Sequence, residues 1–263
     1  MYTLCALHPL RQRFGLAASD TADDARLLAA LQMATAQVER AAERRFVPRR
    51  AAIRHSITGG VELLLDDDLL ALTALTNGDG TAIPLATALL LPADSPAGMI
   101  RLTGGSAFHW TETPLNAVTV SGVWGWHDRW GAAWHRSADT VRDNPLAANA
   151  TTITVADADG VDSLGEMPRF QVGQLLQIED EYLWVLAVDT AANTLSVQRG
   201  ANGTTAAAHA LDTAVSIYQP PADVAALVLR RAAWLYREAD NPGFAPDNLI
   251  EALAGLRRVG VKA

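Results

Sequence analysis

The sequence predicts an α+β protein in which a helical domain, built from N- and C-terminal helices, carries two inserted antiparallel β units. Three observations support this prediction. A long segment with helical periodicity lies near the start of the chain, two more lie near its end, and short runs with strand periodicity lie between them. The predicted domains are a helical domain of residues 1–52 with 220–263, a first β insertion of residues 53–136, and a second small β-barrel or sandwich insertion of residues 137–219.

The first helix is predicted over residues 20–45. Asp20 can cap its start, and Asp23 and Asp24 place negative charge in the first turn, where the helix dipole favours it. Apolar residues then recur at helical spacing, at Leu27, Leu31, Ala34, Val38 and Ala41. Its many alanines give it a thin profile that permits close packing within the chain or against another subunit. Pro48 is expected to end it.

The apolar pattern then changes to the alternation typical of strands. The first β unit is predicted to hold strands at residues 53–57, 61–65, 82–91, 98–102 and 117–123. Gly59-Gly60 and Asn77-Gly78 supply turns between them. The second β unit is predicted to hold strands at residues 151–155, 172–178, 182–188, 194–198 and 215–218. Helices over residues 223–239 and 246–258 complete the chain.

Tryptophans gather where the first β unit ends. Four of the seven fall in a short stretch that we expect to be an aromatic packing or contact loop: Trp124, Trp126, Trp130 and Trp134. Their ring faces suit either internal packing or contact with a ligand. The residues that follow, 137–144, are predicted to be a polar connector.

Composition limits the function. The 263 residues and 49% hydrophobic content allow a substantial core, and a net charge of -8 argues against a surface that grips DNA phosphates throughout. With one cysteine, Cys5, the chain has no intrachain disulfide and no Cys-ligated zinc site. The opening residues do not resemble a secretory signal, and no apolar run approaches the ~18 residues of a membrane helix.

Polar clusters give no sign of catalysis. We expect the aspartates at residues 66–68 to form a solvated turn and the acidic residues 179–181 to form a charged hairpin tip. His127, Asp128 and His135 lack a third imidazole or a thiolate at workable spacing, so a polar loop is preferred over a metal site. Nucleophile-elbow, Walker and dinucleotide-binding motifs are missing from the sequence. The sequence therefore predicts no enzyme, no cofactor and no metal.

A cluster of arginines follows the first helix. It consists of Arg44, Arg45, Arg49, Arg50 and Arg54. Solvation at the end of a helix is one interpretation, and contact with DNA phosphates is another. The interpretation we prefer is ion pairing or docking to a partner, which makes these arginines a candidate subunit or portal interface.

Four segments, in this order, resemble the head–tail connector (adaptor) proteins of tailed phages. They are VERAAERRF at 38–46 with Arg54-His55-Ser56, AVTVSGVWGW at 117–126, TLSVQRGANGTTAAAH at 194–209, and the helix from Pro221 that contains Trp234, Leu235 and Tyr236. The third segment is also similar to a phrase common in phage neck and tail proteins. Within it Gly200 and Gly203 favour a turn, Asn202 tolerates a left-handed conformation, and His209 is expected to be a buried, turn-stabilising side chain.

The resemblance implies a structural protein of the virion, made in the bacterial cytoplasm and placed at the head–tail interface, or neck. Connectors of this family form rings, commonly of twelve copies, that dock beneath the portal protein, extend the DNA channel and bind the next neck or tail protein. Genomic DNA would pass through the lumen without sequence-specific binding. The family has no catalytic residues and implies no membrane partner. Its compact members are mostly helical, so two β insertions would be a departure.

Three alternatives remain at this point. The protein could be another neck or tail component, such as a tail-completion or baseplate protein. The tryptophan-rich stretch could instead mark a carbohydrate-binding β module. A hydrolase would have to use the carboxylates at residues 66–68 or 179–181.

Overall fold

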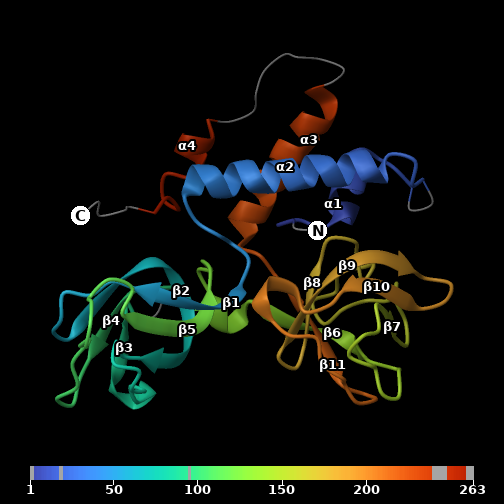
Figure 1. Ribbon diagram of the computed structural model, residues 1–263. Helices are drawn as coiled ribbons and strands as arrows, with labels where there is room; N and C mark the ends of the chain where they lie inside the picture. The colour runs from blue at the N-terminus through green and yellow to red at the C-terminus, as the bar shows by residue number, and fades with distance from the viewer. Residues whose placement is uncertain (1–2, 18–19, 94–95, 239–247, 259–263) are drawn as a thin grey trace. The chain divides into compact units, whose positions relative to one another are not determined.

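Figure 1 shows a computed structural model of the chain, which describes residues 3–17, 20–93, 96–238 and 248–258. The predicted fold class is wrong: the protein is mostly β, with one antiparallel sheet of five strands and another of six. The chain folds into two compact units, Met1–Glu43 with Ala132–Ala263, and Arg44–Gly131. The helices form one part of the first unit and do not make up the body of the fold, because each sheet has a hydrophobic core of its own.

The long N-terminal helix is confirmed as α2 (Asp24–Ala42), but it begins four residues later than predicted, with Asp23 rather than Asp20 at its N-cap position. It ends earlier than predicted, because Glu43 adopts a left-handed conformation with φ 53° and turns the chain well before Pro48. Its inner side buries apolar residues at helical spacing, including Leu27, Leu31, Ala34 and Val38. This spacing of apolar residues is the pattern from which the sequence predicted the helix.

The C-terminal helix α3 (Ala222–Glu238) packs against α2. Two hydrogen bonds fix the pair: Arg231 Nε donates to Gln37 Oε1 at 2.7 Å, and Tyr236 Oη donates to Asp23 Oδ2 at 2.8 Å. The last predicted helix is reduced to α4 (Leu249–Ala252), and the start predicted for it at residue 246 lies outside the described residues.

A short helix that the sequence did not predict, α1 (Leu7–Arg13), joins the helices to the six-stranded sheet of the same unit. The amide of Leu7 donates to Val172 O at 2.9 Å, and Thr3 Oγ1 donates to Gly173 O at 3.0 Å. Among the described residues, no helix is both long and apolar enough to cross a membrane.

The second unit, Arg44–Gly131, is built on the five-stranded sheet. In spatial order its strands are β1 (Arg49–His55), β5 (Val118–Trp124), β2 (Glu62–Thr76), β4 (Ala97–Leu102) and β3 (Ala88–Leu91). A 3-10 turn at Leu85–Thr87 replaces the first half of the strand predicted at 82–91. Side chains on one face of the sheet form a core around Leu63, Ile100, Val120 and Trp124.

Strand β2 continues through the three aspartates at residues 66–68, so the predicted turn there is wrong. The first part of β2 pairs with β4 and the second part with β5. Leu64 lies opposite Met99 and Leu69 opposite Ala97, so β2 carries extra residues where it changes partner. The aspartates occupy this irregular region, which is the usual effect of a β-bulge.

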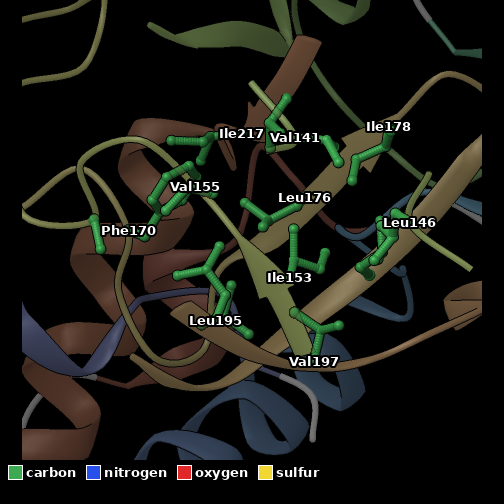
Figure 2. Packing of buried hydrophobic residues seen from close by; sticks show 14 residues of the cluster. Val141, Leu146, Ile153, Val155, Phe170, Leu176, Ile178, Leu195, Val197 and Ile217 are labelled. Carbon is green, nitrogen blue, oxygen red and sulfur yellow. The ribbon is translucent and has the colours of Figure 1, made fainter. Parts of the chain in front are cut away.

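The six-stranded sheet belongs to the first unit. In spatial order its strands are β6 (Trp134–Thr140), β11 (Ala214–Tyr218), β8 (Leu175–Ile178), β9 (Glu181–Asp189), β10 (Thr194–Gln198) and β7 (Thr152–Thr154). The sheet curls, so that the amide of Arg142, just after β6, donates to Thr154 O in β7 at 2.9 Å. Figure 2 shows side chains from β7, β8, β10 and β11 converging in the core that this curl encloses.

Strand β6 corrects the prediction of a polar connector over residues 137–144. It pairs with β11, with Trp134 opposite Tyr218 and His135 opposite Ile217. Its inward positions carry Ser137 and Asp139, two buried polar side chains whose polar atoms form hydrogen bonds within the unit. Polar residues at these positions hide the period-2 alternation on which a strand prediction depends.

Candidate functional site

The arginine cluster lies in the second unit, beside the aspartates of β2. Arg44 Nη1 is 3.0 Å from Asp68 Oδ1, with only 17% and 9% of the two side chains exposed. Arg49 Nη2 is 2.6 Å from Asp67 Oδ2, and both side chains are about one-third exposed. These two arginines therefore neutralise carboxylates of their own chain.

The first aspartate of the run, Asp66, faces a buried histidine. Asp66 Oδ2 lies 3.6 Å from His55 Nδ1; the Asp66 side chain is 94% exposed and that of His55 is 1% exposed. The His55 ring stacks on Trp124, with 5.8 Å between centroids. Burial lowers the pKa of His55, although Asp66 and Asp67 oppose the shift. A neutral ring packed on tryptophan is the result.

The remaining arginines differ in exposure. Arg45 and Arg54 are exposed, and neither pairs with another side chain among the described residues. Arg50 is half-buried on β1 and has interactions of its own. The cluster thus contains two kinds of arginine: those that stabilise the second unit, and two that are available to a partner.

The tryptophans divide between the two units. Trp124 is fully buried, and its Nε1 donates to Ala51 O at 3.0 Å. Trp126 meets the Phe46 ring edge-on at 5.7 Å, and the Arg44 guanidinium lies 5.6 Å from its centroid. Trp130 lies in a 3-10 turn and is half-buried.

Trp134 belongs to the first unit; its ring stacks on that of Tyr182 and is tilted against that of Tyr218. Its ring lies 5.2 Å from that of Tyr182 and 5.2 Å from that of Tyr218. The stretch predicted to be one aromatic loop is therefore split between packing in the second unit and packing in the first.

Two glycines of the segment 117–126 have packing roles. A Cβ at Gly122 in β5 would clash with the carbonyl oxygen of Ala71 in β2. Gly125 has φ +139°, which disfavours other residues, and a Cβ there would lie 3.0 Å from Val47 O. The glycines therefore allow β5 to approach β2 and the chain to turn after Trp124.

The acidic residues 179–181 do not form a simple charged tip. Glu181 is 1% exposed and accepts from Arg199 Nε at 2.7 Å, from the Gly200 amide at 2.8 Å and from the Ala207 amide at 3.1 Å. Arg199 Nη2 also donates to the second carboxylate oxygen at 2.7 Å. This bidentate pair fixes the loop that follows β10.

The predicted roles in that loop are confirmed. Asn202 has φ 51° and ψ 41°, which is left-handed, and His209 is 2% exposed. His209 lies between Glu179 and Glu181, so Arg199 and His209 converge on the buried Glu181, while Glu179 lies at the exposed edge of the cluster. We call this the Glu181 node.

The two histidines considered as metal ligands, His127 and His135, form hydrogen bonds to residues of their own units. His127 Nδ1 accepts from the Arg129 amide at 2.9 Å, and His135 Nε2 donates to Asp162 Oδ2 at 2.8 Å. Within the described ranges, no group of three or more His, Cys, Asp or Glu side chains is placed to hold a metal ion. The sequence did not reveal the pairing of His135 with Asp162, because the two residues are 27 positions apart.

Comparisons with known proteins give limited similarity. No family model and no curated protein matches the chain. Among solved structures, it is similar to a chain of the "neck of empty GTA particle computed with C6 symmetry". In that comparison 21% of residues are identical, the TM-score is 0.34, and the match covers 49% of this chain and 69% of the other.

Proposed function

We propose that this protein is a structural component of a phage-type virion neck and acts as a head–tail connector. In this role copies form a ring beneath the portal, extend the DNA channel, and offer a platform to the next neck or tail protein. The role is one of assembly rather than catalysis. The DNA passes through the ring without sequence-specific contacts.

The observation that carries the proposal is the pairing of α2 with α3. Helix α2 holds the start of the first resemblance segment, residues 38–42, and α3 holds the last segment. Gln37, directly before the first segment, bonds to Arg231 across 194 positions of sequence. Tyr236, within the last segment, bonds to Asp23 across 213 positions. The start of the first segment and the last segment therefore lie on two helices that pack together, although they are far apart in the sequence.

The charge distribution is compatible with a DNA channel. The chain carries a net charge of -8, and a predominantly acidic wall repels phosphate. Arg44 and Arg49 are paired with aspartates, which reduces the positive charge available to hold DNA. A wall of this kind would let DNA slide.

Native mass spectrometry and negative-stain imaging of the purified full chain test the proposal, alone and with portal protein. We expect a closed ring that binds the end of the portal. A chain that stays monomeric and never engages portal would contradict the proposal. Gold labelling of the chain in intact particles separates a connector from the alternative, another neck or tail component. A connector would carry the label beside the portal, whereas another component would carry it away from the portal.

A further inference from the structure

The loop between β7 and β8 presents apolar side chains to solvent. Val161, Leu164 and Met167 are 48%, 53% and 63% exposed, and all three lie within seven consecutive residues. Single exposed apolar residues are ordinary, but a group of them marks an interaction site. We call residues 157–167 the apolar loop.

A buried arginine holds the start of this loop. Arg169 donates through Nη1 to Asp157 O at 2.7 Å and through Nη2 to Val161 O at 2.9 Å. Its Nη1 also pairs with Asp139 Oδ2 at 2.9 Å, with 10% of the Arg169 side chain and 2% of that of Asp139 exposed. The backbone of the loop is thus fixed to β6 of the same unit.

Asp162 holds the middle of the loop. Its Oδ1 accepts from the amides of Leu164 at 2.8 Å and Glu166 at 2.9 Å, and its Oδ2 accepts from His135. Asp162 therefore points inward, while the apolar side chains of Val161, Leu164 and Met167 point outward. A surface held in one shape before contact loses little conformational entropy when it binds.

The loop itself carries negative charge. Asp157, Asp159 and Glu166 are exposed, whereas Arg169 is buried and paired. One exposed arginine, Arg136, lies beside the loop, where its backbone oxygen accepts from the Ser163 amide at 3.2 Å. A complementary surface would combine exposed apolar groups with arginine.

The outward side of α2, in the same unit, has this composition. Met33 is 50% exposed, and Arg26 and Arg40 lie two helical turns to either side of it. Arg26 is held by Asp23 at 3.1 Å, but Arg40 is exposed and pairs with no side chain in the described part of the chain. Of the exposed positions between them, Ala29 and Ala36 are small and leave room for a docking side chain, and Gln32 adds a polar group beside Met33.

We propose that the apolar loop of one copy docks on the outward side of α2 of a second copy. Leu164 and Met167 would contact Met33, and Glu166 would face Arg40. The two surfaces are different, so each copy can bind one neighbour through its loop and another through its helix, which generates a ring or an open chain. This inference rests on the proposed function, for which it supplies the subunit contact.

A paired substitution tests the apolar part. The full-length Leu164→Asp/Met167→Asp variant should associate about tenfold to a hundredfold more weakly than wild type, as truncation of central interface residues does. Leu115→Asp is the matched control, because Leu115 is 67% exposed but belongs to the second unit. Native mass spectrometry across a concentration series measures association, and circular dichroism checks folding. Equal association of the loop variant and wild type would overturn the inference.

A charge exchange tests the pairing itself. Arg40→Glu should weaken association, and adding Glu166→Arg to it should restore most of the loss. If the double variant is weaker than either single variant, the two residues do not face each other and the inference is wrong. Portal binding is scored separately: a ring that forms through these surfaces but ignores portal contradicts the connector function and leaves the inference standing. A wild-type chain that never self-associates overturns the inference.

Discussion

His209 Nε2 lies 2.9 Å from Glu181 Oε2, while its Nδ1 lies 2.7 Å from Glu179 Oε2. The ring therefore joins the buried carboxylate of Glu181 to that of Glu179, whose side chain is 62% exposed. The guanidinium of Arg199 lies 2.7 Å from Glu181 and balances its buried charge.

Glu181→Gln should destabilise the first unit strongly. The amide cannot accept both branches of Arg199 and leaves a buried cation without its partner, which costs about 3–5 kcal/mol when a buried pair is broken. Chemical denaturation followed by tryptophan fluorescence measures the loss. Glu179→Gln is the control: its side chain is 62% exposed, so a loss below about 1 kcal/mol is expected. Equal losses in the two variants would contradict the assignment of Glu181 as the centre of the node.

The same node should respond to acid. Burial by itself raises the pKa of Glu181, but hydrogen bonds from Arg199, His209 and two backbone amides outweigh it and lower the pKa from 4.5 to about 2. The stabilisation is therefore complete above pH 4.5 and is lost as the pH falls from there towards 2. Denaturation at several pH values should show wild type and Glu181→Gln converging in stability across this window. A constant difference between them would show that the pKa is not depressed.

The segment 199–209 could be predicted from sequence because its signals are local. Glycine at positions 200 and 203 and asparagine at 202 favour a turn with left-handed residues, and the structure has them there. The role of His209 as a buried turn-stabilising side chain followed from the same short stretch. The hydrogen-bond partners of His209 could not be predicted, because Glu179 and Glu181 lie 30 and 28 positions away in the sequence.

The aspartates at residues 66–68 show why other parts could not be predicted. Three consecutive carboxylates disfavour a strand unless something neutralises them. The neutralising groups are Arg44, 24 positions from Asp68, and Arg49, 18 positions from Asp67. The aspartates also lie where the pairing of β2 with β4 is irregular. The arginines were conspicuous in the sequence, but nothing local indicated that the two runs face each other.

The fold class was mistaken for a related reason. The helices have strong local periodicity, whereas strands such as β6 bury Ser137 and Asp139 through hydrogen bonds. A prediction from apolar periodicity gives weight to the helices and misses strands of this kind.

Gly122→Ala should destabilise the second unit. A methyl group there would meet the Ala71 carbonyl oxygen and, at 2.8 Å, Cδ1 of Leu69, so β5 and β2 would have to separate. We expect a loss of about 1–3 kcal/mol, as for other overpacked sites. Gly98→Ala in β4 is a matched control, because no atom lies within 4 Å of the added Cβ. Thermal unfolding measures both, and an unchanged melting temperature for Gly122→Ala would contradict the close approach.

Substitution of the individual aspartates at residues 66–68 should lower the free energy of unfolding by different amounts. Asp68→Ala removes the partner of the largely buried Arg44, so we expect a loss of about 3 kcal/mol or more. Asp66→Ala removes a side chain that is 94% exposed, and its effect should stay within about 0.5 kcal/mol. Urea denaturation of both variants gives the comparison. A larger loss for Asp66→Ala than for Asp68→Ala would contradict a structural role for the Arg44–Asp68 pair.

Substitution of the exposed arginines should affect partner binding, whereas substitution of the paired arginines should affect stability. Arg45→Gln/Arg54→Gln should leave the melting temperature unchanged and weaken binding to portal protein, because neither arginine pairs with a side chain among the described residues. Arg44→Gln/Arg49→Gln should instead lower the melting temperature, since it removes the ion pairs of these arginines with Asp68 and Asp67. Portal binding is measured by biolayer interferometry, and genome release by the rate of DNA ejection from assembled particles. If Arg45→Gln/Arg54→Gln leaves assembly intact but slows ejection or packaging, these arginines act on DNA rather than on a protein partner.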